Sequence, residues 1–421
     1  MTLKPALLCC ILQSGVYAAD VPRIVDLGVL PDGSFVKPQS MSADGRVVVG
    51  TMRIRKHNTR GFRWTEAGGM EDLGLPGDAS STTANSANGD GSVIVGSFNS
   101  LTGQGTRASR WIAGSGWQVL ALPTGALNSD AYAISADGST IGGRSNFAGA
   151  GFQAVLWAGD PPTGVEGSPF GGASSAIRCM SVDGSVGVGS FTFSGGAIHA
   201  ARWSSGGSVL DLGALTGGHL SLAEGTNVDG SVVVGGSNLA NGRFAAFRWS
   251  AAAGMTQLAG LPGTYASYAW GISPEGLVVG GDAFDFATYV AVLWSPLLGV
   301  VDLNKFLPKL GVDLSNWKLE RCAALGEEGR VLTGYGTHLG EVRGWIVTGL
   351  PSLAVGCSGD LDADWRVNDS DFVIFLRQYS VLDCAEAGMT DACSGDLDRD
   401  GVVDDADFVI FAVAYDALLC P

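Results

Sequence analysis

The sequence is poor in charge, in basic residues and in histidine, and each scarcity excludes a class of function. Charged residues make up 16% of the 421 residues, and 25 Lys and Arg stand against 41 Asp and Glu, for a net charge of -16. Nucleic acid is excluded as a partner, because no basic stripe could displace phosphate counterions. The 4 histidines share no spacing typical of a metal site or a catalytic triad. Beyond the N-terminal segment, no apolar run reaches the roughly 18 to 20 residues that a membrane helix needs.

The first 19 residues have the composition of a secretory signal peptide. They combine one lysine, a short apolar stretch, and small residues at Val16 and Ala18 before the expected cleavage point. The alternative is a buried N-terminal helix. We therefore expect a bacterial extracellular protein, secreted or held at the cell surface, whose mature chain begins near residue 20.

Cysteines are rare in the body of the chain and regular near its C-terminus. In an oxidising compartment an even set at repeated spacing indicates disulfides, here among Cys357, Cys384, Cys393 and Cys420. Two symmetric pairings satisfy the spacing: 357 with 384 and 393 with 420, or 357 with 420 and 384 with 393. Cys179 and Cys322 stand alone in apolar segments and are expected to be buried thiols.

Glycine is abundant, at 64 residues, and a tryptophan recurs every 45 to 51 residues between positions 20 and 350. The repeated tryptophans close short apolar runs and are Trp64, Trp111, Trp157, Trp203, Trp249, Trp294 and Trp345. Each is preceded by a turn such as SADGRVVVG or NVDGSVVVG, in which an acid-glycine pair predicts a type I′ hairpin. Four short strands in about 46 residues are typical of a propeller blade, and seven units predict a seven-bladed β-propeller.

The ends of the repeat region predict how the ring closes. The seventh unit stops after its third strand at GWIVTG, while an unpaired strand, RIVDLG, stands before the first unit at 23–28. The N-terminal strand would complete the last blade and protect its edge. An open β solenoid is the alternative. The recurring SADGS and HAARW or AAFRW patterns make residues 20–350 resemble the HAF-repeat family of extracellular bacterial repeat proteins, a resemblance that implies no particular chemistry.

Several residues of the body are candidates for a site. The turn acids Asp44, Asp90, Asp137, Asp183, Asp229, Glu275 and Glu328 are best explained by the turns themselves, and the tryptophans by the blade cores. Glu224 and Glu320 lie in first strands and could form a general acid/base pair in the central channel. A pair of carboxylates about 5 to 10 Å apart there would favour a polysaccharide-cleaving enzyme. A channel of Gly, Ser and Ala would favour a binding or structural platform.

The last 70 residues contain two copies of an Asp-rich segment, SGDLDADWRVNDSDFVIF and SGDLDRDGVVDDADFVIF, which we call the acidic line. They hold 14 Asp and 1 Glu against 3 Arg, so most of the net charge lies here. From Asp396 onward, oxygen ligands fall at the positions of a twelve-residue calcium loop, with Gly401 at the sixth position. The predicted ligands of this second loop are Asp396, Asp398, Asp400, Val402 through its carbonyl, Asp404 and Asp407. The alternative is a disulfide-stapled acidic tail without metal.

The first copy of the line has the same spacing with one departure. Its predicted ligands are Asp360, Asp362, Asp364, Arg366 through its carbonyl, Asn368 and Asp371. Trp365 replaces the glycine at the sixth position, where a bulky residue at positive φ is strained by about 1 kcal/mol or more. We expect two Ca²⁺ sites, the first of them weaker. After each loop, apolar residues at i, i+3, i+4 and i+7 predict one helix, and the two helices should pack together.

A duplicated loop-helix unit with Asp at position 12 resembles the dockerin family, which implies two calcium ions and a cohesin-like or cell-surface protein as partner. In that family positions 10 and 11 of the loop help to select the partner. Here these positions are held by Asp369, Ser370, Asp405 and Ala406. They differ from the Ser-Thr pair of many cellulosomal dockerins, which argues against a cellulosomal partner.

The sequence thus predicts a mainly β protein with a small α-helical module. A signal peptide (1–19) precedes a seven-bladed β-propeller (20–350) and a dockerin-like calcium-binding module (351–421). The favoured function is an exported, non-catalytic binding or structural platform carried on a calcium-dependent anchor. The alternative is an extracellular carbohydrate-active enzyme with carboxylates in the channel. The sequence does not identify the propeller's ligand or the docking partner.

Overall fold

The computed structural model describes the propeller almost completely and the C-terminal module in part. The described residues are 21–42, 44–54, 58–103, 105–158, 174–192, 196–204, 207–296, 298–353, 361, 369–381, 384, 393, 395–397 and 401–417. The expected signal peptide therefore lies outside them. In the described part of the chain, no helix is long and apolar enough to cross a membrane.

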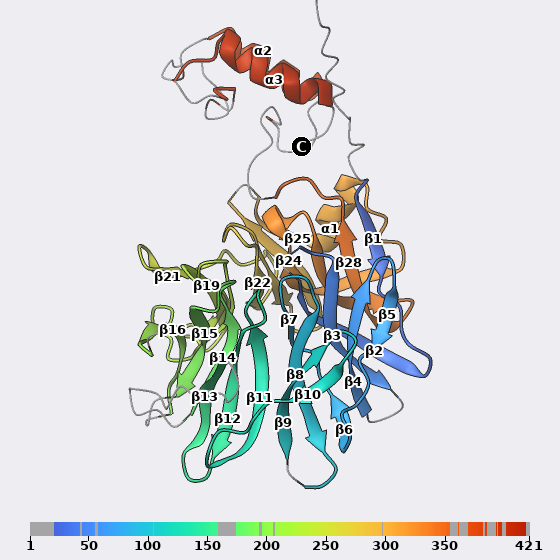
Figure 1. Ribbon diagram of the computed structural model, residues 1–421. Helices are drawn as coiled ribbons and strands as arrows, with labels where there is room; N and C mark the ends of the chain where they lie inside the picture. The colour runs from blue at the N-terminus through green and yellow to red at the C-terminus, as the bar shows by residue number, and fades with distance from the viewer. Residues whose placement is uncertain are drawn as a thin grey trace, which may run out of the picture.

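Seven antiparallel sheets surround a common axis, and we number them as blades in chain order (Figure 1). Blade one contains β2 (Gly33–Met41), β3 (Val47–Ile54), β4 (Asn58–Thr65) and β5 (Gly69–Asp72). Blade two contains β6 (Ala79–Thr82), β7 (Ser86–Ala87), β8 (Val93–Ser100), β9 (Thr106–Ile112) and β10 (Gly116–Val119). Blade three contains β11 (Ala126–Ile134), β12 (Thr140–Phe147) and β13 (Gly151–Ala158). Blade four contains β14 (Ser174–Met180), β15 (Val186–Thr192), β16 (Ile198–Ser204) and β17 (Val209–Gly213).

The remaining blades repeat the pattern. Blade five contains β18 (Ser221–Thr226), β19 (Val232–Asn238), β20 (Phe244–Ser250) and β21 (Gly254–Gln257). Blade six contains β22 (Ala266–Ile272), β23 (Val279–Phe284), β24 (Tyr289–Ser295) and β25 (Gly299–Asp302), followed by α1 (Leu303–Phe306) and a 3₁₀ turn at Leu307–Leu310. Blade seven contains β26 (Trp317–Leu325), a 3₁₀ turn at Glu327–Gly329, β27 (Leu332–His338), β28 (Glu341–Thr348) and the N-terminal strand β1 (Arg23–Asp26).

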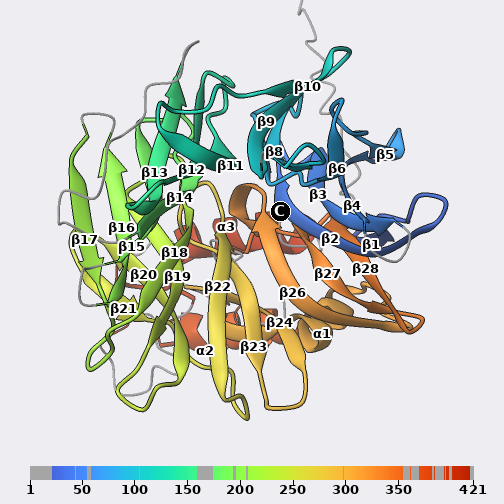
Figure 2. The same ribbon diagram turned by 90° about the horizontal axis from the view of Figure 1, so that it is seen from below.

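The predicted closure of the ring is confirmed. β1 pairs antiparallel with β28, with Arg23 opposite Thr348 and Asp26 opposite Trp345. The innermost strands β2, β7, β11, β14, β18, β22 and β26 contact one another in sequence around the ring, and β26 contacts β2 again (Figure 2). The fold is therefore a closed seven-bladed β-propeller, and the solenoid alternative is wrong.

The repeated tryptophans form the blade cores, as predicted. All seven are buried, with at most 8% of the side chain exposed. Neighbouring blades are also joined by polar contacts, because a hydroxyl at the start of one inner strand accepts a hydrogen bond from the third strand of the previous blade. Ser221 accepts from the Ala200 amide at 2.8 Å, and Ser267 accepts from the Ala246 amide at 3.0 Å.

The acid-glycine turns differ from the prediction in their type. In the first six repeats the glycine has positive φ but the acid before it does not, so these are not type I′ turns. The loop is longer: the Ser42 amide donates to the Val47 carbonyl, and the Gly45 amide donates to the Ser42 carbonyl. A type I turn followed by a left-handed glycine satisfies both bonds.

The C-terminal module contains two helices, α2 (Asp369–Tyr379) and α3 (Asp405–Ala417). Phe375 and Phe411 are almost fully buried, and their ring centroids lie 5.0 Å apart. The predicted packing of the two helical faces is therefore present. Leu376 and Phe408, which the spacing i, i+3, i+4 and i+7 counted from Phe372 and Phe408 places on the same two faces, are 46% and 42% exposed.

Candidate functional site

One residue in each blade interrupts the pairing of the innermost strand and faces the propeller axis. Six of these residues sit at a register shift, and Asn85 lies in the gap between β6 and β7. A β-bulge of this kind re-aims a side chain out of the regular alternation. We call these seven the ring residues: Gln39, Asn85, Tyr132, Arg178, Glu224, Trp270 and Ala323. Each stands five positions before the turn acid of its repeat.

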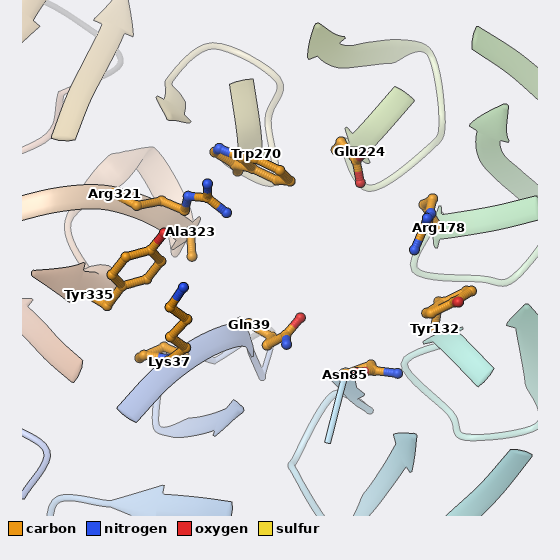
Figure 3. Close-up of a pocket in the computed structure, with 11 residues that line it drawn as sticks. Lys37, Gln39, Asn85, Tyr132, Arg178, Glu224, Trp270, Arg321, Ala323 and Tyr335 are labelled. Carbon is orange, nitrogen blue, oxygen red and sulfur yellow. The ribbon is translucent and has the colours of Figure 1, made fainter. Parts of the chain in front are cut away.

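The ring residues line a cavity of about 480 Å³ at the centre of the propeller (Figure 3). Lys37, Pro38, Arg321 and Tyr335 complete its wall. Three of the lining side chains are basic, three are aromatic and two are primary amides, whereas Glu224 is the one acid among them. The lining is therefore neither the carboxylate pair expected of an enzyme nor the small-residue surface expected of a structural platform.

A glycine on the second strand of each blade makes the bulge sterically feasible. These glycines are Gly50, Gly96, Gly143, Gly189, Gly235, Gly281 and Gly334. At each of them, a Cβ atom would lie 1.9 to 2.2 Å from the carbonyl oxygen of the residue two positions before the ring residue. No side chain can be accommodated there without moving the inner strand. The repeated glycine is thus the sequence mark of the bulge.

Arg321 is held rigidly in the cavity wall by Asp282 and Trp270. Its Nε donates to Asp282 Oδ2 at 2.7 Å, and its guanidinium carbon lies 3.8 Å from the Trp270 ring centroid. The Trp270 indole nitrogen donates to the same carboxylate oxygen at 2.9 Å. Burial raises the pKa of Asp282 and outweighs the opposing effect of Arg321. The guanidinium is therefore oriented before any ligand arrives, with its end directed into the cavity (Figure 3).

Lys37 lies between two aromatic rings at the same side of the cavity. Its ammonium nitrogen is 4.5 Å from the centroids of both Phe35 and Tyr335. Burial lowers the pKa of Lys37, and the nearby positive charge of Arg321 lowers it further. An anion between the two cations would relieve this repulsion.

The opposite wall carries Arg178, Tyr132 and Glu224. The Arg178 guanidinium carbon lies 4.5 Å from the Tyr132 ring centroid. Burial raises the pKa of Tyr132 to about 12, and the Asp130 carboxylate raises it in the same direction. The Tyr268 hydroxyl donates to Glu224 Oε1 at 3.2 Å. Burial raises the pKa of Glu224, although Arg178 acts in the opposite direction.

The structure separates the two acids that were predicted to form a catalytic pair. Glu224 lines the cavity, as expected. Glu320 sits at a second irregularity of β26 and accepts a hydrogen bond from the Thr337 hydroxyl at 2.8 Å; it is not part of the cavity wall. The cavity wall therefore contains Glu224 without Glu320, and the predicted pair is not found in the lining.

The five aspartates among the turn acids each accept a hydrogen bond from a backbone amide of their own turn, which is the structural role predicted for them, whereas Glu275 accepts the Glu328 amide of the next repeat. Asp137 and Asp183 each accept hydrogen bonds from a serine hydroxyl and a backbone amide of their own turn. These hydrogen bonds lower the pKa of both carboxyls. The described histidines also lie apart: His199 contacts Asp211, His219 contacts Asn238, and His338 contacts Asp26.

Only a few residues of the two predicted calcium loops are described, among them the acids at position 12. Asp371 and Asp407, at position 12 of each loop, are fully buried in the first turns of α2 and α3. The same oxygen of each accepts a backbone amide from position 2 of its loop, Leu361 or Leu397, at 2.6 and 2.5 Å. The described residues of the two copies thus place the last acid of each line in the same buried position, with the same backbone partner.

The second loop has glycine in the conformation that position 6 was expected to adopt. Gly401 has φ 96°, so only glycine is comfortable at position 6, and its amide donates to Asp396 Oδ2 at 3.0 Å. Two further predicted ligands of this loop, Val402 and Asp404, are among the described residues. The other predicted ligands, Asp360, Asp362, Asp364, Arg366, Asn368, Asp398 and Asp400, lie outside the described residues.

Cys384 and Cys393 form a disulfide, with their Cα atoms 5.5 Å apart. This is one half of the second of the two predicted pairings, whereas Cys357 and Cys420 lie outside the described residues. Cys179 and Cys322 are free thiols, and Cys322 is fully buried.

The four positions predicted to select a partner are exposed at the starts of the two helices. They are Asp369, Ser370, Asp405 and Ala406.

Of the seven ring residues, sequence reasoning identified Glu224 alone and missed the other six. Their identities differ from blade to blade, so the repeat alignment shows no common chemistry at this position. Their fixed place five residues before the turn acid, opposite an obligatory glycine, is the signal that could have found them.

Comparison with models of known protein families gives no match, and neither does comparison with curated proteins. Among solved structures, the chain is similar to an oligogalacturonate lyase from Vibrio parahaemolyticus, with 9% identity, 77% of this chain and 93% of that chain covered, and a TM-score of 0.53. It is also similar to the propeller domain of the Trilobed protease from Pyrococcus furiosus, with 7% identity, 75% and 95% covered, and a TM-score of 0.51.

A weaker likeness is to TolB from Acinetobacter baumannii, with 14% identity and a TM-score of 0.42 over 64% of this chain and 63% of that chain. At these identities the comparisons show the propeller fold alone. The Pyrococcus domain is described as having an open velcro topology. Here β1 closes blade seven instead.

Proposed function

We propose that the protein is an exported binding protein whose propeller cavity holds an acidic saccharide, and whose C-terminal module anchors it in a calcium-dependent manner. The observation that carries the proposal is the cavity lining: Lys37, Arg178 and Arg321 stand against a single acid, Glu224, beside three aromatic rings and two amides. Guanidinium groups bind carboxylates in a bidentate manner, aromatic rings stack on the apolar faces of sugars, and amides bind hydroxyls.

The structural likeness to an oligogalacturonate lyase suggests a first set of probes. We would titrate oligogalacturonates, and neutral oligosaccharides of equal length, into the full-length protein by calorimetry. Binding of the acidic sugars alone supports the proposal. The proposal is contradicted if the neutral sugars bind equally well, or if neither set binds.

The variant that best tests the cations is Arg178→Gln. We expect it to weaken binding of oligogalacturonate about thirtyfold. The variant removes a positive charge from the cavity, and the lost interaction with the ligand should reduce the free energy of binding by about 2 kcal/mol. Arg178 is preferred to Arg321, whose loss would leave the buried Asp282 without its cation. Arg110→Ala, on β9, is the matched control and should bind as the wild type does. Equal affinity of Arg178→Gln and Arg110→Ala would contradict the cavity as the binding site.

The raised pKa of Glu224 predicts a pH dependence of binding. Ionised Glu224 repels an acidic ligand, whereas protonated Glu224 does not, so affinity should increase as the pH falls through the raised pKa of this carboxyl. Glu224→Gln should bind more tightly at neutral pH and lose this part of the pH profile. A profile that is identical in wild type and Glu224→Gln would show that Glu224 does not face the ligand.

The anchor is proposed from the buried carboxylates of the two loops. Two calcium ions would bind at the predicted loops, and a cohesin-like or cell-surface protein would bind at the starts of α2 and α3. The buried acids Asp371 and Asp407, one per loop, support this module. Release of reducing ends from a bound polysaccharide would overturn the non-catalytic assignment and favour the carbohydrate-active enzyme.

A further inference from the structure

Two groups of aromatic contacts, joined through Arg243, lie between the cavity and the propeller surface at blades five and six. The Trp270 and Tyr268 ring centroids lie 4.5 Å apart, and those of Tyr268 and Phe244 lie 6.1 Å apart. Arg243, which precedes Phe244, places its guanidinium carbon 4.3 Å from the Tyr265 ring centroid. Tyr265 in turn lies 4.1 Å from Phe286. We call Trp270, Tyr268, Phe244, Tyr265 and Phe286 the aromatic track.

The outer end of the track is exposed and strained. Phe286 lies in the hairpin between β23 and β24, and 71% of its side chain is exposed. Its φ is 73°, a conformation that is costly for a bulky residue. The loop is fixed around it, because Asp285 Oδ1 accepts the amides of Ala287 and Thr288 at 3.1 and 2.8 Å. An exposed ring is thus held in place where glycine would be easier.

The track is longer than one sugar. Tyr265, which directly precedes β22, and Trp270, within β22, are five residues apart, which corresponds to roughly 16 Å between their Cα atoms in extended chain. A ligand that touches both ends must therefore be a chain. Arg243 supplies a positive charge beside Tyr265, at the outer end of the track, in addition to the cations of the cavity.

We infer that the aromatic track is an extended subsite for an acidic oligosaccharide, which enters the cavity at one end and stacks on Tyr265 and Phe286 at the other. This inference rests on the proposed function, since it assigns the ligand's length and exit path. The acidic groups lie against Arg243 and the cavity cations, and the apolar sugar faces lie against the rings.

The test compares a galacturonate disaccharide with a long oligogalacturonate in the full-length protein. We expect the long ligand to bind wild type at least tenfold more tightly than the disaccharide does. Phe286→Ala should weaken the long ligand about tenfold and leave the disaccharide unchanged, whereas Phe286→Tyr, which keeps the ring, should restore the affinity. Leu339→Ala is the matched control, because Leu339 is 73% exposed, has φ 51° and occupies the corresponding hairpin of blade seven.

The outcomes separate this inference from the proposed function. Equal affinity of both ligands for wild type overturns the extended subsite and leaves the cavity assignment intact. Equal loss for both ligands in Phe286→Ala also overturns it, since Phe286 would then act on the cavity as a whole. Failure of both ligands to bind wild type overturns the proposed function and this inference together. If Phe286→Ala instead abolishes self-association without changing saccharide affinity, the track is a protein interface and the inference is wrong.

Discussion

Gly235→Ala should destabilise the propeller by about 3 kcal/mol or more in denaturant unfolding of the full-length protein. A Cβ at this position would lie 1.9 Å from the Leu222 carbonyl oxygen, and the other nearest atoms are also backbone atoms of the inner strand, so no side-chain movement can relieve the clash. Relief requires the inner strand of blade five to move, and Glu224 moves with it. We therefore expect ligand binding to weaken in the same variant, even under conditions in which it remains folded.

Gly260→Ala is the control for this prediction. No atom lies within 4 Å of its Cβ position and its φ is not positive, so the change should stay within about 0.5 kcal/mol of wild type. If Gly235→Ala unfolds at the same denaturant concentration as Gly260→Ala, close approach of the inner strand does not explain the repeated glycine.

Asp407→Asn should abolish tight calcium binding at the second loop. The substitution keeps an oxygen that can accept from the Leu397 amide but removes the buried charge that a Ca²⁺ site needs at position 12. Calcium at one hundred times its Kd stabilises a folded module by about 2.7 kcal/mol, and the variant should lose that increment at the second loop. Calorimetric titration of the full chain, with circular dichroism of α2 and α3, measures both effects.

Asp405→Asn is the matched control for the calcium experiment. Asp405 lies in the same helical turn and loses the same charge, but it is exposed and its carboxylate accepts from the Tyr379 hydroxyl. It should bind calcium as the wild type does. Absence of any binding at millimolar calcium in wild type would reduce the repeat to an acidic tail stapled by disulfides, and the anchoring proposal would fail.

The blade architecture was predictable because its signals repeat. Tryptophans every 45 to 51 residues report seven equivalent cores, and the strand at 23–28 has no partner unless it completes the last blade. The type of the turns was not predictable from the Asp-Gly pair alone, because Ser42 and its equivalents lengthen each loop through their own hydrogen bonds.

The cavity was hidden for the opposite reason. A repeat alignment emphasises what the units share, whereas the ring residues range from Ala323 to Trp270 and share only their backbone geometry. Glu320 stands eight positions before the turn acid Glu328, whereas Glu224 stands five positions before Asp229, so Ala323 and not Glu320 is the counterpart of Glu224 in blade seven.

The pairing of β1 with β28 also determines when the domain can finish folding. The partners are separated by more than three hundred residues, so they can meet only after nearly the whole propeller has been synthesised. The entropy of closing so long a loop rises only slowly with length, by about 0.6 kcal/mol per doubling, but the search for such distant contacts is slow. Until β1 pairs with β28, the free edge of β28 can pair with strands of other chains. The first strand of the propeller thus protects the edge of its last strand.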